Sequence, residues 1–359
     1  MLINKIDIKA TSNLFSFLNL ITLLLLTSCK KDELEISTRT INFNTKYIND
    51  TICIDNNNYL IYNPYKNKGN FQLKGMLHCH TNNSYNVDKF GSGIPVENIT
   101  KWKEEGNYDF FSITDHNYAT EIIEIDGIIN IGKGIEDTKK QQHLVILNLP
   151  NDYIYIDKGE DINILSKYYN NLGAYVVYAH PLWNGAYQSD DMIKRSNLCK
   201  FVEIYSNTVE SARAFDIMLS EGNLVTAIGV DDYHYNKTIK NSYFNKAWTI
   251  VYAQKKVKES IWQALLSGAS YASTGAEISN IKISKYGEIE VKCKKSSIIR
   301  FLGFNNQNIA DPIELKINKN STLANYQVKG NEEYIRIEII NEEGKASSQA
   351  FLIYKIIIK

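Results

Sequence analysis

Successive apolar runs of strand length in this chain end at a histidine, an aspartate or a glutamate, and this pattern constrains the fold more than any other feature. Helical stretches separate the runs, and such alternation is typical of βα units with a largely parallel sheet. In parallel α/β barrels the functional groups stand at the carboxyl ends of the strands, so these side chains are expected to converge. The runs are residues 73–77 before His78 and His80, 109–114 before Asp115 and His116, 128–135 before Glu136, 174–179 before His180, 201–202 before Glu203, and 224–230 before Asp231, Asp232 and His234.

The remaining periodicity divides the chain into a mixed region and an all-β region. Helices are predicted over residues 96–105, 161–172, 211–221 and 256–266, and in the second of these Ile162, Leu165 and Tyr169 recur at helical spacing. After about residue 273 the apolar residues alternate with period two, over 281–284, 288–292 and 334–339. We therefore expect an α/β domain followed by a small antiparallel β-sandwich.

The length and charge of the chain bound its organisation. Its 359 residues exceed the ~250–300 residues at which single cores stop growing, so two domains are expected. We assign residues 1–29 to a signal peptide, 30–70 to a polar tether with a few short strands, 71–273 to the α/β domain and 276–359 to the β-sandwich. A hydrophobic fraction of 44% excludes wholesale disorder. With 40 acidic and 40 basic side chains and no basic stripe, no nucleic-acid partner is expected.

The amino terminus is typical of a secretory signal. Lys5 and Lys9 precede the apolar run 14–26, which is shorter than the roughly 20 apolar residues of a membrane-spanning helix. The run leads into Leu-Thr-Ser-Cys, which resembles a bacterial lipobox and implies that Cys29 is lipidated; a signal anchor with an incidental cysteine is the alternative. Residues 30–33 resemble the surface-export signal of Bacteroidetes lipoproteins. We expect an exported protein anchored in a bacterial membrane, the outer membrane and its surface being the finer hypotheses, with the lipid bilayer as a partner through acylated Cys29.

The cysteines that follow the predicted lipidation site do not form a motif. Cys53, Cys79, Cys199 and Cys293 are scattered, with no zinc-ribbon pair and no dense disulfide framework. An oxidising compartment would allow a disulfide bond, and the spacing does not select a pair.

The histidines are confined to one part of the chain. All 6 lie between His78 and His234, and none lies in the predicted tether or sandwich. A single histidine at a strand end is more often a satisfied core residue than a ligand, but joint occurrence beside carboxylates indicates a metal site. Imidazole and carboxylate suit Zn, Mn or Fe, and so many ligands exceed the need of one tetrahedral ion. The pattern therefore predicts a multinuclear metal site.

Five sequence blocks that contain these ligands follow one another in a recognisable order. They are His78-Cys79-His80-Thr81, Ile113-Thr114-Asp115-His116, Gly134-Ile135-Glu136, Ala179-His180-Pro181 and Asp232-Tyr233-His234. Their order and spacing, over about residues 71–273, resemble the PHP (polymerase and histidinol phosphatase) family of metal-dependent hydrolases. Residues 247–251 and 268–275 resemble the closing segment of exported members that carry a carboxyl-terminal β-domain. The resemblance implies a distorted (β/α)7 barrel that holds two or three divalent metal ions.

The resemblance also implies a group of ligands for each ion. Glu136 would bridge the first two ions. The first ion would be bound by His78, His80 and Asp232, the second by His143 and His180, and the third by His116 and His234.

Some positions depart from this pattern or have another explanation. His143 begins the predicted strand 143–149, where a polar residue has an ordinary structural reason. The family commonly shows Ser-Asp-Gly after His-x-His, whereas this chain has Ser-Tyr-Asn-Val-Asp at residues 84–88. Either Asp88 substitutes for the family's aspartate after a small insertion, or the third metal site is weakened. Asp231 is expected to be a neighbour and not a ligand, because the family's aspartate stands two places before His234.

Catalytic and substrate-binding roles are assigned to five residues. Glu136, Asp115 and His234 are the expected catalytic residues. Asp115 is either a ligand or a group that orients a histidine, and the second role is favoured. Glu203 and Arg195 are the candidates for substrate contact, and as a carboxylate at a strand end Glu203 has an equally good structural explanation.

The leading hypothesis is a metal-dependent phosphoesterase that uses a di- or trinuclear site to activate water against a small phosphorylated substrate. Amide, ester or carbamate hydrolysis on the same site stays open, because a fold does not select the substrate. A non-catalytic, surface-tethered binding lipoprotein is the third hypothesis, and the near-complete ligand set argues against it. No oligomeric state is predicted.

Overall fold

The computed structural model describes residues 34–36, 47–84, 93–138, 142–159, 161–185, 187–234, 243–304 and 312–358. The predicted signal peptide and Cys29 lie outside these residues. The chain divides into two units, one of Met1–Ser37 with Ile356–Lys359 and one of Thr38–Lys355. In the described part of the first unit, strand β1 (Leu34–Ile36) pairs antiparallel with residues 356–358. Within the described ranges, no helix combines the length and the apolarity that crossing a membrane requires.

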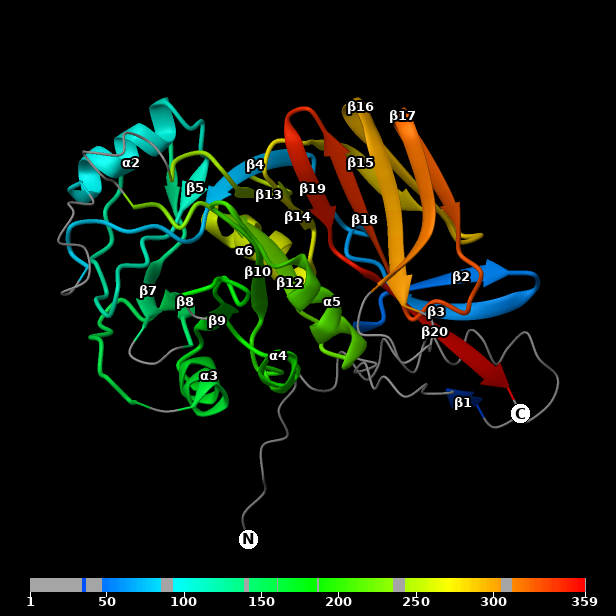
Figure 1. Ribbon diagram of the computed structural model, residues 1–359, viewed down its shortest axis with the longest axis horizontal. Helices are drawn as coiled ribbons and strands as arrows, with labels where there is room; N and C mark the ends of the chain where they lie inside the picture. The colour runs from blue at the N-terminus through cyan, green and yellow to red at the C-terminus, as the bar shows by residue number, and fades with distance from the viewer. Residues whose placement is uncertain are drawn as a thin grey trace, which may run out of the picture. The chain divides into compact units, whose positions relative to one another are not determined.

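The strands in the middle of the chain form a 6-stranded sheet (Figure 1). Its order is β11-β10-β9-β8-β7, and β12 also pairs with β10. β9, β10 and β12 are parallel, whereas β8 runs antiparallel to both of its neighbours. The strands are β7 (Lys133–Asp137), β8 (Leu144–Leu149), β9 (Tyr175–Tyr178), β10 (Phe201–Ser206), β11 (Val209–Glu210) and β12 (Thr226–Val230).

A 14-stranded sheet contains the remaining strands. In its α/β part, β4, β5 and β6 are parallel, and β13 is antiparallel to β4 and to β14. These strands are β4 (Phe71–Met76), β5 (Phe110–Phe111), β6 (Ile129–Asn130), β13 (Trp248–Ala253) and β14 (Ser270–Ser273).

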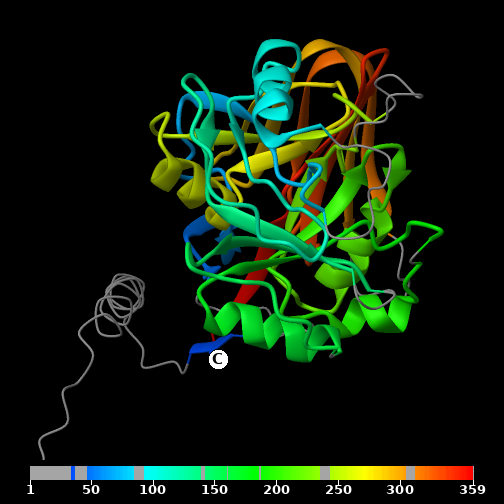
Figure 2. The same ribbon diagram turned by 90° about the vertical axis from the view of Figure 1, so that its left-hand side faces the viewer.

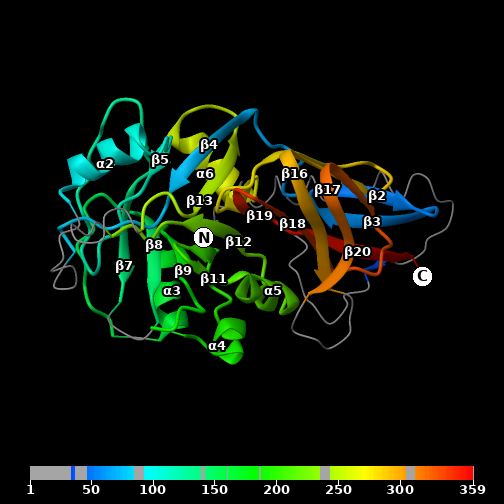
Figure 3. The same ribbon diagram turned by 45° about the horizontal axis from the view of Figure 1, so that its top comes forward.

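Four helices match the predicted ranges to within two residues, namely α2 (Pro95–Glu104), α3 (Ile162–Asn171), α5 (Ala212–Ser220) and α6 (Lys258–Ser267). The short helix α4 (Asp190–Arg195) was not predicted. Asp161 caps α3 by accepting a hydrogen bond from the Asn163 N–H, and α6 ends at Gly268, whose φ of 71° suits glycine. α3 packs on β8 and β9, α5 on β10 and α6 on β13 (Figure 3). α2 lies on the opposite side of the strands from α3 and α4 (Figure 2).

The predicted closed (β/α)7 barrel is not evident, because its strands divide between two open sheets. The predicted strand 128–135 is broken into β6 and β7, which belong to different sheets. Gly132 lies at the break with a φ of 131°, an angle that residues with a Cβ rarely adopt. β12 and β13 form no ladder with each other; instead the Thr249 hydroxyl accepts from the Gly229 N–H (3.1 Å) and donates to the Gly229 carbonyl (2.8 Å). The described fold is therefore mixed α/β and rich in strands.

The carboxyl-terminal strands pair antiparallel, as their alternation predicts. β16 pairs with β17 along its length, with β15 through residues 289–293 and with β18 through residues 298–304. The predicted tether contains a hairpin of β2 (Asp50–Ile54) and β3 (Asn57–Tyr62) that pairs with β20 and buries Ile61. The strands of this region are β15 (Ile278–Ile283), β16 (Glu288–Phe304), β17 (Ile313–Gln327), β18 (Tyr334–Asn341), β19 (Gly344–Ser348) and β20 (Phe351–Ile358). The described cysteines, Cys53, Cys79, Cys199 and Cys293, are free thiols.

The α/β region and the β region are in direct contact within the second unit. β19 pairs with β14, so both regions share the large sheet. The guanidinium of Arg336 on β18 donates to both carboxylate oxygens of Asp216 on α5, at 2.7 Å each. The Tyr334 hydroxyl donates to Asp216 Oδ1 at 2.9 Å, and all three side chains are buried. The predicted boundary at residues 273–276 stays a prediction.

Replacement of Arg336 by alanine should lower the free energy of unfolding by about 3–5 kcal/mol, because Asp216 is then a buried charge without its partner. Replacement of both residues by apolar ones, Arg336→Leu with Asp216→Leu, should recover most of this loss, since no charge stays stranded. Lys194→Ala is the control, because it removes an exposed ion pair with Glu221 and should change the free energy by less than ~1 kcal/mol. Equilibrium unfolding in urea measures all three. Equal effects of Arg336→Ala and Lys194→Ala would contradict the prediction.

Candidate metal centre

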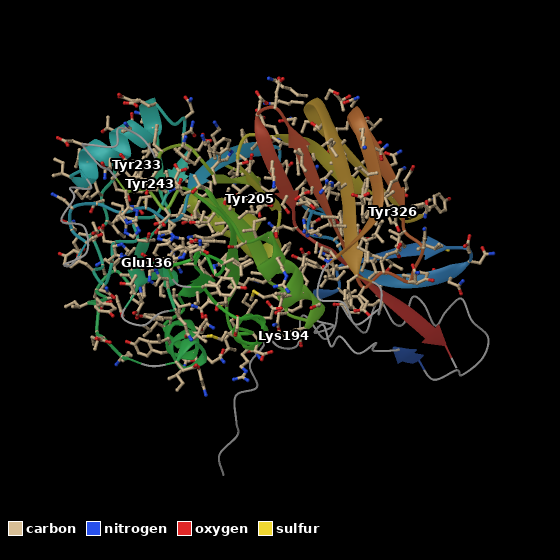
Figure 4. All side chains as sticks on the ribbon, in the orientation of Figure 1. Glu136, Lys194, Tyr205, Tyr233, Tyr243 and Tyr326 are labelled. Carbon is tan, nitrogen blue, oxygen red and sulfur yellow. The ribbon has the colours of Figure 1, made fainter. Side chains whose placement is uncertain are left out.

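The ends of strands from both sheets bring the predicted ligands together. His78 and His80 follow β4, His180 follows β9, and Glu136 lies within β7. Backbone contacts beyond the strands hold these ends in register: the His80 N–H donates to the Tyr233 carbonyl at 2.9 Å, and residues 116 and 136 form an isolated parallel bridge. Glu136 and Tyr233 lie in the same part of the molecule in Figure 4.

A first group of ligand atoms forms a nearly equilateral triangle. His78 Nε2 and His80 Nε2 are 3.1 Å apart, and Asp232 Oδ1 lies 3.2 Å from the first and 3.1 Å from the second. Glu136 Oε2 lies 3.5 Å from both nitrogens. Ligands of one tetrahedral ion at ~2.1 Å stand about 3.4 Å from one another, so the triangle has nearly the size of a single-ion site.

A second group faces the other oxygen of Glu136. His143 Nδ1 lies 3.0 Å and His180 Nε2 lies 3.3 Å from Glu136 Oε1. His78, Glu136 and His180 each offer a ligand atom within 4.8 Å of the other two. The two oxygens of one buried carboxylate therefore point to two different groups of imidazoles.

A third group is formed by His80, His116 and His234, whose ligand atoms lie within 4.8 Å of one another. His116 Nε2 and His234 Nε2 are 3.3 Å apart, and the ring of His80 stacks on that of His116 at a centroid distance of 4.1 Å. His116 Nδ1 also approaches Glu136 Oε2 at 2.7 Å. The departure from the family pattern at Asp88 lies outside the described residues, so this third group is defined by its histidines.

Electrostatics favour a bound cation at this cluster. Burial lowers the pKa of His78, but the carboxylates of Glu203, Asp232 and Glu136 raise it well above its ordinary value. Burial raises the pKa of Glu136, but the imidazoles of His116 and His78 hold it well below its ordinary range. Burial, with the imidazoles of His116 and His234, holds the pKa of His80 well below its usual value. The lowered pKa values of Glu136 and His80 favour the ionised carboxylate and the neutral imidazole, which are the forms that ligate metals. The carboxylates that raise the pKa of His78 by attracting its proton would likewise attract a metal cation.

Buried polar atoms without hydrogen-bond partners support the same reading. Among the described residues, His80 Nδ1 and His180 Nδ1 are buried and have no hydrogen-bond partner. A buried polar atom left without a partner costs about 1–3 kcal/mol, and a charged one costs more. The set of imidazole and carboxylate donors fits Zn, Mn or Fe. These residues could therefore hold divalent metal ions.

Glu203 contacts two of the predicted ligands, and its contact with substrate stays a prediction. Its side chain is fully buried. Oε1 lies 2.7 Å from His78 Nδ1, and Oε2 accepts a hydrogen bond from the His180 N–H at 2.9 Å. Because a carboxylate only accepts, Nδ1 of His78 carries the proton and Nε2 is left as the ligand atom. Glu203 is a positioning residue for two ligands.

Asp115 is also a positioning residue, and its predicted catalytic role is not supported by its contacts. It is fully buried, and its two oxygens accept hydrogen bonds from the Thr81 N–H, the Thr81 hydroxyl and the hydroxyls of Ser84 and Thr120. The Ser84 hydroxyl in turn accepts from the His116 N–H at 3.2 Å. Asp115 thus orders the backbone after His80, where we expected it to orient a histidine ring.

Asp231 is a neighbour of the ligands, as expected. Its carboxylate accepts hydrogen bonds from the backbone N–H groups of residues 245, 246 and 247 and from the Tyr108 hydroxyl. These bonds hold the chain on either side of Asp232 and His234.

Two of the predicted ligands have backbone angles that residues with a Cβ rarely adopt. Asp232 has a φ of 48° and His180 a φ of 25°, and the surrounding structure maintains this strain.

Arg195 is not brought to the cluster. It is exposed at the carboxyl end of α4, next to Lys194, which lies far from Glu136 in Figure 4. Two exposed aromatic residues that border the histidines, Trp183 and Tyr243, were not predicted from the sequence. The proximity of Trp183 to His180 in the sequence is the one signal that would have indicated it.

No protein-family model matches this chain, and no curated protein matches it. Among solved structures, it is similar to a two-domain protein containing a predicted PHP-like metal-dependent phosphoesterase from Bacteroides vulgatus ATCC 8482. The sequence identity is 14%, the TM-score is 0.44, and the alignment covers 90% of this chain and 100% of that chain. The assignment of the site rests on its geometry.

Addition of Mn²⁺ or Zn²⁺ to chelator-treated protein should raise the midpoint of thermal unfolding. A metal that binds only the folded state stabilises it by about 2.7 kcal/mol at a metal concentration 100 times the dissociation constant. Glu136→Gln should remove most of this shift, whereas Glu342→Gln, at an exposed carboxylate, should keep it. Scanning calorimetry measures the midpoints. A shift of equal size in Glu136→Gln would contradict the assignment of Glu136.

Glu203→Gln should weaken metal binding about 10–100-fold, because the amide cannot accept from both the His78 ring and the His180 backbone. A direct contact of Glu203 with substrate would instead raise KM and leave metal affinity unchanged. Titration with metal, followed by calorimetry, separates these outcomes. Glu210→Gln on β11, at an exposed carboxylate, is the matched control and should bind metal as the wild type does.

Proposed function

We propose that this protein is a metal-dependent hydrolase, and more specifically a phosphoesterase with two or three divalent ions. The observation that carries the proposal is the position of Glu136, a buried carboxylate whose Oε2 lies among the nitrogens of the first and third groups and whose Oε1 faces the second. Such a bridge is the arrangement that a multinuclear site needs. Zn, Mn and Fe are the candidate ions.

Divalent ions at such a site supply Lewis-acid polarisation of a phosphoryl oxygen and a water molecule of lowered pKa. The chain's own residues hold this arrangement and exclude bulk water from it, since His78, His80 and Glu136 are buried. His78 is fixed in one tautomer by Glu203. These groups would bind and orient the reacting centre.

His234 is the group best placed to handle a proton. Its Nδ1 lies 2.8 Å from the Asp232 carbonyl, which can only accept, so Nδ1 carries the hydrogen and Nε2 faces His116 with its lone pair. The side chain of His234 is 28% exposed, compared with 19% for His143 and 7% for His116. Nε2 of His234 can therefore serve as a ligand or accept a proton from water at the solvent side.

The finer features of the fold and location belong to the same proposal. We infer an open, distorted relative of the PHP barrel, because parallel β4–β5–β6 and β9–β10–β12 each deliver ligands from their carboxyl ends. Export and lipid anchoring through Cys29 are proposed from the amino-terminal sequence alone. Metabolic labelling with a fatty acid, in the wild type and in Cys29→Ala, tests the anchor.

The metal-loaded protein should hydrolyse aryl phosphate mono- or diesters. Glu136→Gln should lower kcat/KM about 100-fold or more, because it removes the carboxylate that faces both the first and the second group of ligand atoms. Glu342→Gln should retain wild-type activity. Rates on phosphate esters and on aryl carboxylic esters are measured in parallel, with metal content determined by elemental analysis. Turnover of the acyl esters alone, or full activity of Glu136→Gln, would overturn the phosphoesterase assignment.

A further inference from the structure

An exposed indole lies beside the second group of ligands. Trp183 is 41% exposed, whereas Trp102 and Trp262 are 0% and 7% exposed. Its ring centroid lies 5.3 Å from that of His180 and 5.8 Å from that of His143. The side chain of His143 is itself 19% exposed, so solvent reaches the cluster at this point. A large apolar ring therefore borders the accessible side of the second group.

The backbone of the surrounding loop holds this indole in place. A Cβ at position 185 would lie 2.4–2.6 Å from three atoms of the Trp183 ring, so the ring lies directly against the Gly185 backbone. The base of the loop is closed by a hydrogen bond from the Gln188 N–H to the Pro181 carbonyl at 2.9 Å. The Trp183 N–H donates to the His180 carbonyl at 2.9 Å. The indole therefore packs directly against the backbone of Gly185, and a ligand can bind against it in that position.

A second exposed aromatic ring borders the third group. Tyr243, labelled in Figure 4, is 37% exposed, and its ring centroid lies 6.3 Å from that of His234. Aromatic surface thus lies at two sides of the histidine cluster. A ligand that covers an exposed apolar ring removes apolar area from water, which favours binding. A planar aromatic group adds the favourable energy of an aromatic pair.

We propose that Trp183 is a binding platform for a planar ring of the substrate, so that the site takes phosphoesters of ring-bearing alcohols in preference to small aliphatic phosphates. This inference rests on the proposed function, since it places the phosphoryl group among the ligands of Glu136 and the alcohol part against the indole. Gly185 is part of the platform, because a side chain there would displace the ring. Trp183 is a specificity-determining residue and takes no part in the chemistry.

The platform is tested by measuring ligand binding to the metal-loaded protein with calorimetry. Phenylphosphonate is compared with methylphosphonate, and benzohydroxamate is compared with acetohydroxamate. Both hydroxamates chelate metal without resembling a phosphoester. The wild type should bind each phenyl compound about three- to tenfold more tightly than its methyl counterpart. Trp183→Ala and Gly185→Ala should lose this preference at unchanged metal content. Trp183→Phe should retain it, as should Tyr286→Ala, which removes an exposed aromatic side chain of the β region.

Each remaining outcome is decisive. Equal affinities in the wild type, or a preference that persists in Trp183→Ala, would overturn the platform. Loss of metal from Trp183→Ala would also overturn it, because the indole would then serve to hold His143 and His180. A phenyl preference confined to the hydroxamates, without phosphonate binding or phosphoester turnover, would support the platform and reject the phosphoesterase proposal.

Discussion

The burial of Glu136 is the constraint on which the arrangement of the cluster depends. A carboxylate that is almost completely removed from water is stable in its charged form only if opposite charge or hydrogen-bond donors surround it. Here the surrounding groups are imidazoles that come from β4, β9 and the chain between β5 and β6, so strands of both sheets must end within a few ångströms of one another. Asp115, Asp231 and Glu203 fix those ends through backbone hydrogen bonds, and this explains why so many acidic side chains are buried at one place.

The sequence predicted that the histidines, Glu136 and Asp232 converge, because ligand types follow apolar strands and the chain has few histidines. It also predicted four helices closely, since their apolar residues recur at helical spacing. It did not predict the break at Gly132, because the apolar run 128–135 is continuous in composition and only the backbone angle of the glycine separates its two halves. That break places β6 and β7 in different sheets, and the distorted (β/α)7 barrel that the family resemblance implies is not evident.

The roles of the carboxylates were harder to predict than their positions. Glu203 lies within β10 and Asp232 follows β12; Glu203 Oε1 contacts Nδ1 of His78, whereas Asp232 Oδ1 faces Nε2 of the same ring. That difference depends on the direction in which each side chain points from the sheet, which residue type does not encode. Arg195 was chosen for its charge alone, and α4 places it at the surface away from the cluster. Trp183 was missed because its importance comes from the Gly185 backbone beneath it and not from any ligand motif.

The two-sided contact of Glu203 also links the first group of ligand atoms to the second. One oxygen contacts the ring of His78 in the first group and the other accepts from the backbone of His180 in the second, where φ is 25°. A displacement of this one carboxylate would therefore disturb both groups at once.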